Sequence, residues 1–488
     1  MKIALVSSEA VPFAKTGGLG DVAGTLFHEF WLAGHEVTLF LPLYRTIRAA
    51  YGARLREACE SFPVPLGSET APCRVFSLPK LPFAPKAGRK PAHQIGRVLF
   101  IANDAFYDRD EYYTTADGAY PDNHVRFIFF CKAVLEASRR LGLSFDALHC
   151  HDWQTGLIPL MMKEWYGTSP HFAQTRTVFT IHNLGYQGLF PAETMDVIGL
   201  DRRWFGMEGL EFYGQVNFLK AGLIAADVLT TVSPTYAREI LTPAGGFGLD
   251  GVLRKRSGSL YGIVNGIDYA EWTPYSDPHL PSRFSSSHLA GRAWCRRHLV
   301  KEFQLAEGLD RPLIAFVGRL ADQKGVDILA EAIPEMITMG ANIAIVGKGD
   351  PKLQELLLGL SRDHSGRMML MIGFDETLAH RIYATADIFL MPSRYEPCGL
   401  GQMIAMRYGA IPVARRTGGL ADTIDHGRTG FLFDGYSAAS LLAGVREALT
   451  VWSDRKAWKR MIRSAMDEDF SWARSAGQYL RLYREGIL

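Results

Sequence analysis

The chain has 488 residues, of which 48% are hydrophobic and 21% charged, and its formal net charge is +2. This length exceeds what one ordinary core can use and predicts two large α/β domains. The near-neutral charge excludes a global field for nucleic acid or an anionic membrane, so any phosphate binding must come from a local site.

The cysteines and the apolar runs bear on the compartment. The six cysteines are scattered and include no C-x-x-C pair, which is typical of reduced, mostly buried thiols. The first apolar run covers only residues 3–6, and no stretch approaches the ~18 apolar residues of a membrane helix. We therefore expect a cytoplasmic protein without a signal peptide or membrane span.

The first half alternates short apolar runs with helical patterns, which favours a parallel sheet. Two stretches do not follow this alternation of strand and helix patterns. The Pro-rich residues 60–95, with Lys80, are expected to form a solvated insertion. A loop at 106–123 combines aromatic and acidic residues, including Tyr113 and Asp122, which suits carbohydrate as well as ordinary packing under a long loop. The expected strands are 3–6, 36–41, 97–101, 145–153, 177–181 and 228–233, and the expected helices are 21–33, 125–141 and 154–166.

A glycine-rich turn with a lysine, residues 15–21, lies between the first expected strand and the first helix. That order presents backbone N–H groups and a cation to an anion. Neither the dinucleotide fingerprint nor a Walker A loop can be read across Gly17, Gly18 and Gly20. By itself, the pattern favours a tight turn with a surface lysine.

Polar residues follow two other expected strands. His151 and Asp152 end the strand at 145–153, and His182 follows the strand at 177–181. Ligands of open parallel sheets lie beyond the carboxyl ends of the strands, so these residues are placed where function tends to be. A metal site at His149 and His151 is disfavoured, because no further ligand cluster of recognised spacing accompanies them.

The second half restarts the α/β pattern after Pro and Gly residues cluster at 243–251. Its expected strands are 313–318, 342–349, 369–373, 387–392 and 411–414. Arg319 and Lys324 follow the first of these, just before a helix that begins at Val326. The predicted domains are 1–243 and 244–456, followed by a helical tail at 457–488 that packs on the first domain.

The candidate residues form one chemical set. Lys15 with its glycines, His182, the Arg319 and Lys324 pair, and Glu396 all lie at expected carboxyl ends of strands, divided between the two halves. Cations for a diphosphate and a carboxylate for hydroxyl groups indicate nucleotide-sugar chemistry.

Nine motifs in order over nearly the whole chain resemble the bacterial glycogen synthases and plant starch synthases, glycosyltransferase family 5. They are Ser8-Glu9, Lys15-Thr16-Gly17-Gly18-Leu19-Gly20-Asp21-Val22, His151-Asp152-Trp153, Thr180-Ile181-His182-Asn183, Glu211-Phe212-Tyr213-Gly214, Asn265-Gly266-Ile267-Asp268, Arg319-Leu320 with Gln323-Lys324-Gly325, Glu396-Pro397-Cys398-Gly399-Leu400, and Arg416-Thr417-Gly418-Gly419-Leu420.

The resemblance implies a GT-B fold, with two Rossmann-like domains around a deep cleft that closes on the donor. It implies retaining transfer of glucose from ADP-glucose to the non-reducing end of an α-1,4-glucan such as glycogen, with no cofactor and no metal, and it leaves the oligomeric state open. By this match, Lys15, Arg319 and Lys324 hold the diphosphate, Glu396 binds the glucose hydroxyls, and His182 lies beside the transferred sugar.

The other residues expected at the nucleotide sugar are Gly17, Gly18, Asp21, Phe374, Cys398, Gly399, Leu400, Thr417 and Gly418, with Phe374 against the adenine. The residues expected on the acceptor side are Asp146, Tyr113 and Asp122.

Three alternatives remain at this point. One is a GT-B enzyme that uses UDP-glucose or another acceptor. A second is a glycogen phosphorylase, which needs a pyridoxal phosphate lysine and is usually a much longer chain. The third is a catalytically dead glucan-binding protein of the same fold. Many relatives outside this family carry a second glutamate where this chain has Ile404, which favours the synthase family over a general sucrose- or mannosyl-type transferase.

Overall fold

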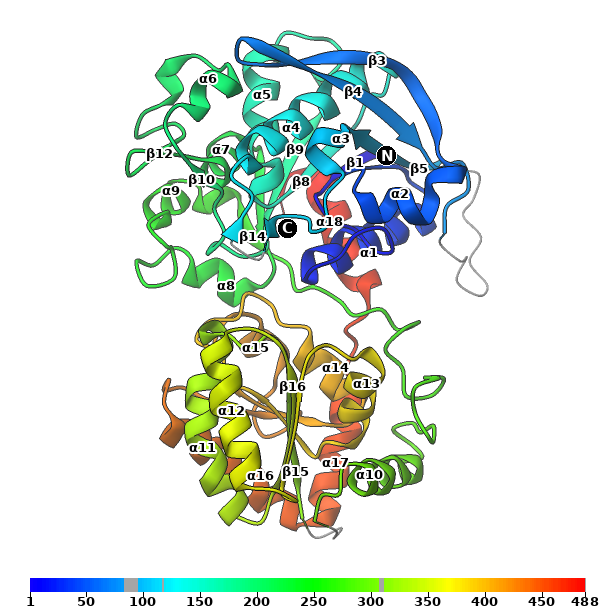
Figure 1. The fold of residues 1–488 in the computed structure, drawn as a ribbon, viewed down its shortest axis with the longest axis vertical. Helices are drawn as coiled ribbons and strands as arrows, with labels where there is room; N and C mark the ends of the chain where they lie inside the picture. Colours follow the sequence, from blue (N-terminus) through cyan, green and yellow to red (C-terminus); the bar gives the residue numbers. More distant parts are fainter. Residues whose placement is uncertain (83–94, 116–117, 307–310, 488) are drawn as a thin grey trace. The chain divides into compact units, whose positions relative to one another are not determined.

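The computed structural model describes residues 1–82, 95–115, 118–306 and 311–487. The chain divides into two compact units (Figure 1). The first comprises Met1–Val232, Ala237–Ile263 and Trp472–Leu488, and the second comprises Ser233–Tyr236 and Val264–Ser471. Among the described helices, none has the length and apolar character needed to cross a membrane.

The first unit is built on a nine-stranded sheet in which every strand from β14 to β5 pairs in parallel. β1 and β8 are buried along almost their whole length, as expected for central strands covered on both faces. In spatial order the strands are β14 (Leu260–Gly262), β13 (Val228–Thr231), β9 (Arg176–Ile181), β8 (Ala147–His151), β1 (Lys2–Val6), β2 (Glu36–Pro42), β5 (Gly96–Ala102), β4 (Glu69–Ser77) and β3 (Arg56–Leu66).

The helices of this unit bury apolar faces against the sheet and against each other. α1 and α18 pack together, and Phe30 of α1 lies 5.5 Å from the ring of Tyr483 in α18 (Figure 1). The helices are α1 (Gly18–Leu32), α2 (Arg45–Tyr51), α3 (Asp104–Tyr107), α4 (Asn123–Arg140), α5 (Leu157–Tyr166), α6 (Thr194–Ile198), α7 (Phe218–Ala225), α9 (Asp250–Lys255) and α18 (Trp472–Glu485), while α8 (Pro234–Glu239) straddles the division between units.

The expectation of a solvated insertion at 60–95 is wrong for its first half. β3 and β4 form an antiparallel hairpin that extends the sheet through pairing of β4 with β5. Alternating burial along β3, with Phe62 and Val64 inward, shows a strand with one covered face. Residues 83–94 lie outside the described part of the chain.

The units divide the chain differently from the predicted boundaries at 243 and 456. β14 pairs with β13 and keeps residues up to Ile263 in the first unit, so the glycine cluster at 243–251 forms a loop and the start of α9 within that unit. Of the predicted tail, α17 (Arg455–Met466) belongs to the second unit. Only α18 belongs to the first, where the Tyr483 hydroxyl lies 2.7 Å from His149 Nδ1.

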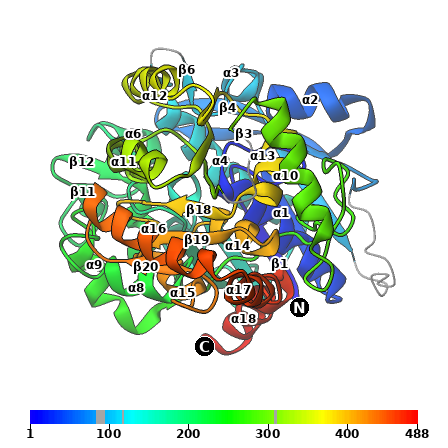
Figure 2. The same cartoon turned by 90° about the horizontal axis from the view of Figure 1, so that it is seen from below.

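The second unit is built on a six-stranded parallel sheet with helices on its faces. Figure 2 shows α14 and α17 beside β19, and these elements are in contact. Its strand order is β17 (Met368–Ile372), β16 (Asn342–Gly347), β15 (Leu313–Val317), β18 (Ile388–Met391), β19 (Ile411–Arg415) and β20 (Phe431–Phe433). Its helices are α10 (Ala290–Glu302), α11 (Val326–Thr338), α12 (Pro351–Asp363), α13 (Glu376–Thr385), α14 (Gly401–Arg407), α15 (Gly418–Thr423), α16 (Ala438–Ser453) and α17.

Each sheet reverses its strand order once near its centre. In the first unit the reversal lies between β1 and β8, and in the second between β15 and β18. At such a point the connections leave toward opposite faces, and a crevice opens beyond the carboxyl ends of the two strands. The loops that follow these four strands are therefore the first places to look for a site.

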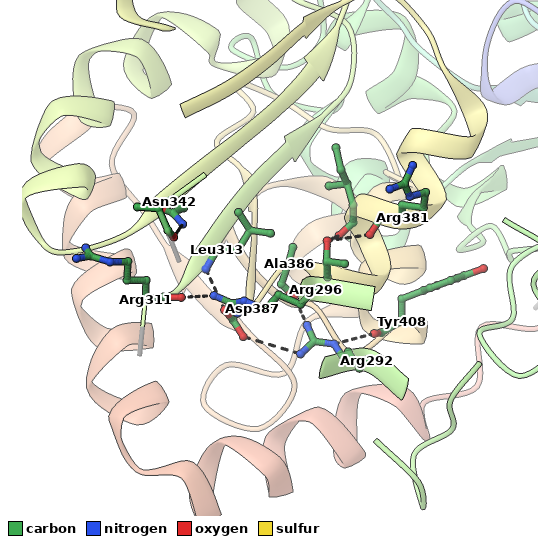
Figure 3. Close-up of polar contacts among 12 residues, drawn as sticks. Arg292, Arg296, Arg311, Leu313, Asn342, Arg381, Ala386, Asp387 and Tyr408 are labelled. Carbon is green, nitrogen blue, oxygen red and sulfur yellow. Dashed lines mark hydrogen bonds and ion pairs between the residues drawn. The ribbon is translucent and has the colours of Figure 1, made fainter. Parts of the chain in front are cut away.

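A buried charge cluster anchors the amino ends of β15 and β18 (Figure 3). Asp387 accepts hydrogen bonds from Arg296 and, at 2.9 Å, from the backbone N–H of Leu313. Arg292 also donates to the carbonyl of Ala386, so two arginines of α10 are tied to the start of β18. Removing the carboxylate charge would leave two buried guanidinium groups with less compensation.

We therefore expect Asp387→Asn to lower the free energy of unfolding of the second unit by about 3–5 kcal/mol. The matched control is Glu335→Gln, since Glu335 pairs with Arg446 at an exposed position, and it should cost less than about 1 kcal/mol. Urea unfolding followed by circular dichroism measures both. Equal effects of the two substitutions would contradict the anchoring function of Asp387.

Candidate active site

The turn after β1 is ordered by a buried carboxylate, Glu9. Its side chain accepts hydrogen bonds from the backbone N–H of Thr16 and, at 2.7 Å, from the Thr16 hydroxyl. The Tyr113 hydroxyl lies 2.7 Å from Glu9 Oε1 and 2.7 Å from Ser8 Oγ. Glu9 thus holds Thr16 in place, and with it the loop that carries Lys15.

Lys15 and two glycines face open space at the start of α1. Lys15 Nζ lies 2.7 Å from Asp21 Oδ1 in the first turn, and the Lys15 side chain is 47% exposed. A Cβ atom added at Gly17 or Gly18 would meet no heavy atom of the described chain within 4 Å. Packing among the described residues therefore does not explain why these positions are glycine. Glycine does leave room for an anion to approach the backbone N–H groups at the helix N-terminus.

Asp152, directly after β8, holds the backbone beside His182. Its φ of 56° and ψ of −177° are strained for a residue with a side chain. The Asp152 carboxylate accepts the His182 N–H at 2.7 Å, and the Asp152 N–H donates to Thr180 at 3.0 Å. A strained backbone conformation that is held by surrounding hydrogen bonds is typical of a functional site.

Three histidines form a chain behind this loop. His182 Nε2 lies 3.0 Å from His151 Nδ1, and the His151 and His149 rings are 4.0 Å apart between centroids. Burial lowers the pKa of His182 to about 3, and burial, with the neighbouring histidines, holds the pKa of His149 and His151 well below 6.5. All three are neutral at physiological pH.

In the second unit a cation and a carboxylate are joined beyond β15 and β18. Lys324 Nζ lies 2.6 Å from Glu396 Oε2, and the Ser393 hydroxyl donates to the same oxygen at 2.9 Å. Glu396 is buried, with a side chain 6% exposed, while Lys324 is 20% exposed. The exposed Arg319 lies on the same loop and donates to Gln323 Oε1 at 3.1 Å.

Two glycines allow this close packing. Gly325 has a φ of 70°, and a Cβ atom there would lie 2.1 Å from the carbonyl oxygen of Pro392. Gly418 has a φ of 43°, and its Cβ would lie 1.9 Å from the carbonyl oxygen of Glu396. The loops after β15 and β19 can therefore close on the segment around Glu396 only with glycine at these positions.

The chain matches two family models, the starch synthase catalytic domain at residues 2–255 and glycosyl transferases group 1 at residues 300–465. It is 46% identical to a glycogen synthase of Thermodesulfovibrio yellowstonii over 99% of this chain and 97% of that protein. It is 45% identical to a glycogen synthase of Geotalea daltonii, over 99% and 98%. The chain belongs to the glycogen and starch synthase family.

A solved structure gives the fold of the family. The catalytic domain of starch synthase IV from Arabidopsis thaliana, bound to ADP and acarbose, superposes with a TM-score of 0.86 at 31% identity, over 99% of this chain and 98% of that one. A sucrose-phosphate synthase from Thermosynechococcus elongatus shares the fold alone, at 18% identity and a TM-score of 0.62. The GT-B fold expected from the sequence, with two α/β units on parallel sheets, is confirmed.

The predicted site residues are divided between the two units. In the second unit, Arg319 and Lys324 follow β15, and Glu396 follows β18. Cys398 is buried and packs against Gly419, while Phe374, after β17, is 83% exposed. Gly399 and Leu400 precede α14, and Thr417 and Gly418 begin α15. In the first unit, Tyr113 joins the Lys15 loop through Glu9.

Two predicted acceptor residues have other tasks in the structure. Asp146 lies at the amino end of β8, where its carboxylate accepts the Lys2 N–H at 2.7 Å. That is the sheet edge opposite Asp152, so Asp146 lies away from the loops that carry the other candidate residues of the first unit. Asp122 accepts from Arg109 at 2.8 Å and stabilises the aromatic loop.

Sequence reasoning did not single out Glu9, Ser393 or Gln323 as contributors to the site. Glu9 and Gln323 occur within the family motifs, but their sequence positions do not reveal that Glu9 holds Thr16 or that Gln323 holds Arg319. The signal available for Glu9 was a carboxylate between the first apolar run and the glycine-rich turn.

The lowered pKa of His182 predicts an acid effect on stability. The unfolded imidazole takes up a proton near pH 6.5 and the folded one only near pH 3, so stability is lost as pH falls through this window. In His182→Gln this loss should shrink by up to about 1.4 kcal/mol per pH unit. Urea unfolding at several pH values measures it, with His288→Gln, an exposed histidine, as control. Parallel pH profiles of wild type and His182→Gln would refute the assignment.

Proposed function

We propose that the chain is a glycogen synthase that transfers glucose from ADP-glucose to the non-reducing end of an α-1,4-glucan, with retention of anomeric configuration. The observation that carries the proposal is the Lys324–Glu396 pair beside Arg319 at the strand reversal of the second unit. It offers cations for a diphosphate and a carboxylate for sugar hydroxyls. Relatives named glycogen synthases over the full length support this activity, and a relative bound to ADP and acarbose supports this donor and acceptor chemistry.

In the proposed reaction, Arg319 and Lys324 stabilise the negative charge that develops on the departing diphosphate. In the first unit, Lys15 and the N-terminal N–H groups of α1 offer positive charge of the same kind to an anion. The Lys15 ammonium is oriented by Asp21, which lies 2.7 Å away. No side-chain nucleophile is needed if the leaving phosphate itself takes the acceptor proton, so preorganised positive charge carries most of the rate acceleration.

The remaining residues grip the sugar and the base. Glu396, held by Lys324 and Ser393, accepts hydrogen bonds from the glucose hydroxyls. His182 is neutral, so it contributes a hydrogen bond to the transferred glucose and no charge. Phe374, 83% exposed, offers a ring face for the adenine. The proposed transfer step uses no metal or cofactor.

We place the protein in the cytoplasm, because its six cysteines are unpaired, as is typical of a reducing compartment.

The donor is tested by initial rates of glucose transfer onto glycogen from ADP-glucose and from UDP-glucose, with linkage analysis of the product. We expect transfer from ADP-glucose and new α-1,4 linkages. Preference for UDP-glucose would support the alternative donor, and glycogen binding without release of ADP would support a catalytically dead binding protein.

Charge at the diphosphate is tested by single substitutions. Lys324→Ala, Arg319→Ala and Lys15→Ala should each lower kcat/KM by about 30- to 1000-fold, which corresponds to about 2–4 kcal/mol of transition-state stabilisation. The exposed Lys352 on α12 provides the control Lys352→Ala, which should retain wild-type turnover. Wild-type turnover in any of the three test variants would remove that residue from the proposed site.

A further inference from the structure

A second cluster of ligating side chains lies in the second unit, apart from the residues assigned to glucose transfer. Asp277 and His279 belong to the segment between β14 and α10, and Glu376 and His380 lie on α13. Residues four apart on a helix share one face, so Glu376 and His380 point the same way. Ligand atoms of His279, Glu376 and His380 all lie within 4.8 Å of one another.

His380 is held as a metal-binding histidine usually is. Its ring is 1% exposed, and Nδ1 lies 2.7 Å from Asp277 Oδ2. Within the described part of the chain, its buried Nε2 has no hydrogen-bond partner. A carboxylate that accepts from one ring nitrogen fixes the tautomer and leaves the lone pair of the other nitrogen for a metal.

His279 repeats this arrangement with a hydroxyl in place of the carboxylate. Its Nδ1 lies 3.0 Å from the Thr377 hydroxyl, next to Glu376 on α13. When the imidazole donates this bond, its Nε2 lone pair is the free one. The cluster thus brings two imidazoles and one carboxylate together, and Glu376 supplies the carboxylate from an exposed position.

Asp277 is itself fixed from several sides. Its carboxylate accepts hydrogen bonds from the Tyr408 hydroxyl at 2.6 Å and from the backbone N–H of His279 at 2.8 Å. Burial alone would raise the pKa of Asp277, but the bonds from His380 and Tyr408 outweigh it and lower the pKa. The Tyr408 carbonyl in turn accepts from Arg292 at 3.3 Å, which ties the cluster to the buried charges around Asp387 (Figure 3).

We propose that His279, Glu376 and His380 bind one Zn²⁺ ion, with Asp277 as the outer partner that orients His380. Two imidazoles and one carboxylate are a ligand set that zinc takes, with a water in the fourth position. The ligand atoms need to approach by about 1 Å for bonds of ~2.0–2.2 Å, which the exposed Glu376 side chain can supply.

A hydrogen-bonded pair of His380 and Asp277 without any metal is the competing interpretation. Such a pair leaves the buried Nε2 of His380 without a hydrogen-bond partner in the described structure, and an unsatisfied buried polar atom costs free energy. Trp272 stacks on the His380 ring with centroids 4.0 Å apart, which shields one face of the ring from water. A metal ion bound at Nε2 would give this nitrogen a partner.

A bound ion would join the segment around His279 to the first turns of α13. This joint involves none of the residues proposed to contact the donor or the acceptor. It would therefore stabilise the second unit without taking part in glucose transfer. Binding to the folded state alone raises the apparent stability in proportion to RT ln(1 + [Zn²⁺]/Kd).

The experiment uses the untagged full chain, freed of metal by a chelator and then titrated with ZnCl2 by calorimetry and by thermal unfolding. We expect one Zn²⁺ per chain and a rise in Tm. His279→Gln and Glu376→Gln, both at incompletely buried positions that should not prevent folding, are expected to weaken Zn²⁺ binding by at least about 10- to 100-fold and to abolish the rise in Tm. Glucose transfer at 25 °C should be the same with and without chelator.

The matched control is His298→Gln. His298 lies 3.6 Å from Glu302 on α10, a surface pair of the same residue types four apart on a helix. This control should bind Zn²⁺ as the wild type does. Equal Zn²⁺ affinity in His279→Gln and the wild type would overturn the proposal, as would the absence of stoichiometric binding to the wild type.

Discussion

The carboxyl ends of all strands in a parallel sheet lie at one edge, and the placement of the candidate residues within each unit depends on that constraint. Each unit reverses its strand order once, between β1 and β8 in the first and between β15 and β18 in the second. The loops that follow these four strands carry Lys15, Asp152, Arg319 with Lys324, and Glu396. In each unit the strand reversal opens a crevice beyond the carboxyl ends of the strands, and charged side chains follow those strands.

Within each unit, a buried glutamate orders the loop that carries the cation. Glu9 and Glu396 are both buried, and each accepts a hydrogen bond from a nearby hydroxyl group and one from a second donor. Glu9 fixes the Lys15 loop through its hydrogen bonds with Thr16, whereas Glu396 contacts Lys324 directly. A buried carboxylate without such partners would be costly, so each glutamate and its loop stabilise each other.

The two Gly-Gly pairs show why similar sequence does not mean similar structure. A Cβ atom added at Gly17 or Gly18 would meet no described heavy atom within 4 Å, whereas Gly418 and Gly419 lie against the backbone of Glu396 and Cys398. The first pair leaves room for a ligand, and the second allows two loops to pack. The sequence Thr-Gly-Gly-Leu occurs at residues 16–19 and again at 417–420, and its glycines serve a different physical purpose at each place.

The sequence by itself determined most of the parallel strands, the α/β class and the family, because period, turn residues and ordered motifs are local properties. It also singled out Lys15, His182, Arg319, Lys324 and Glu396 as candidate site residues, since each follows an apolar run that is typical of a strand. The tertiary structure decided what local patterns cannot carry. Pairing of β4 with β5 drew the first half of the Pro-rich stretch at 60–95 into the sheet, and packing divided the predicted tail, with α17 in the second unit and α18 in the first. It placed Asp146 at the opposite sheet edge, and it brought His279 to Glu376 and His380 across about a hundred residues, because such contacts arise only when separate elements pack.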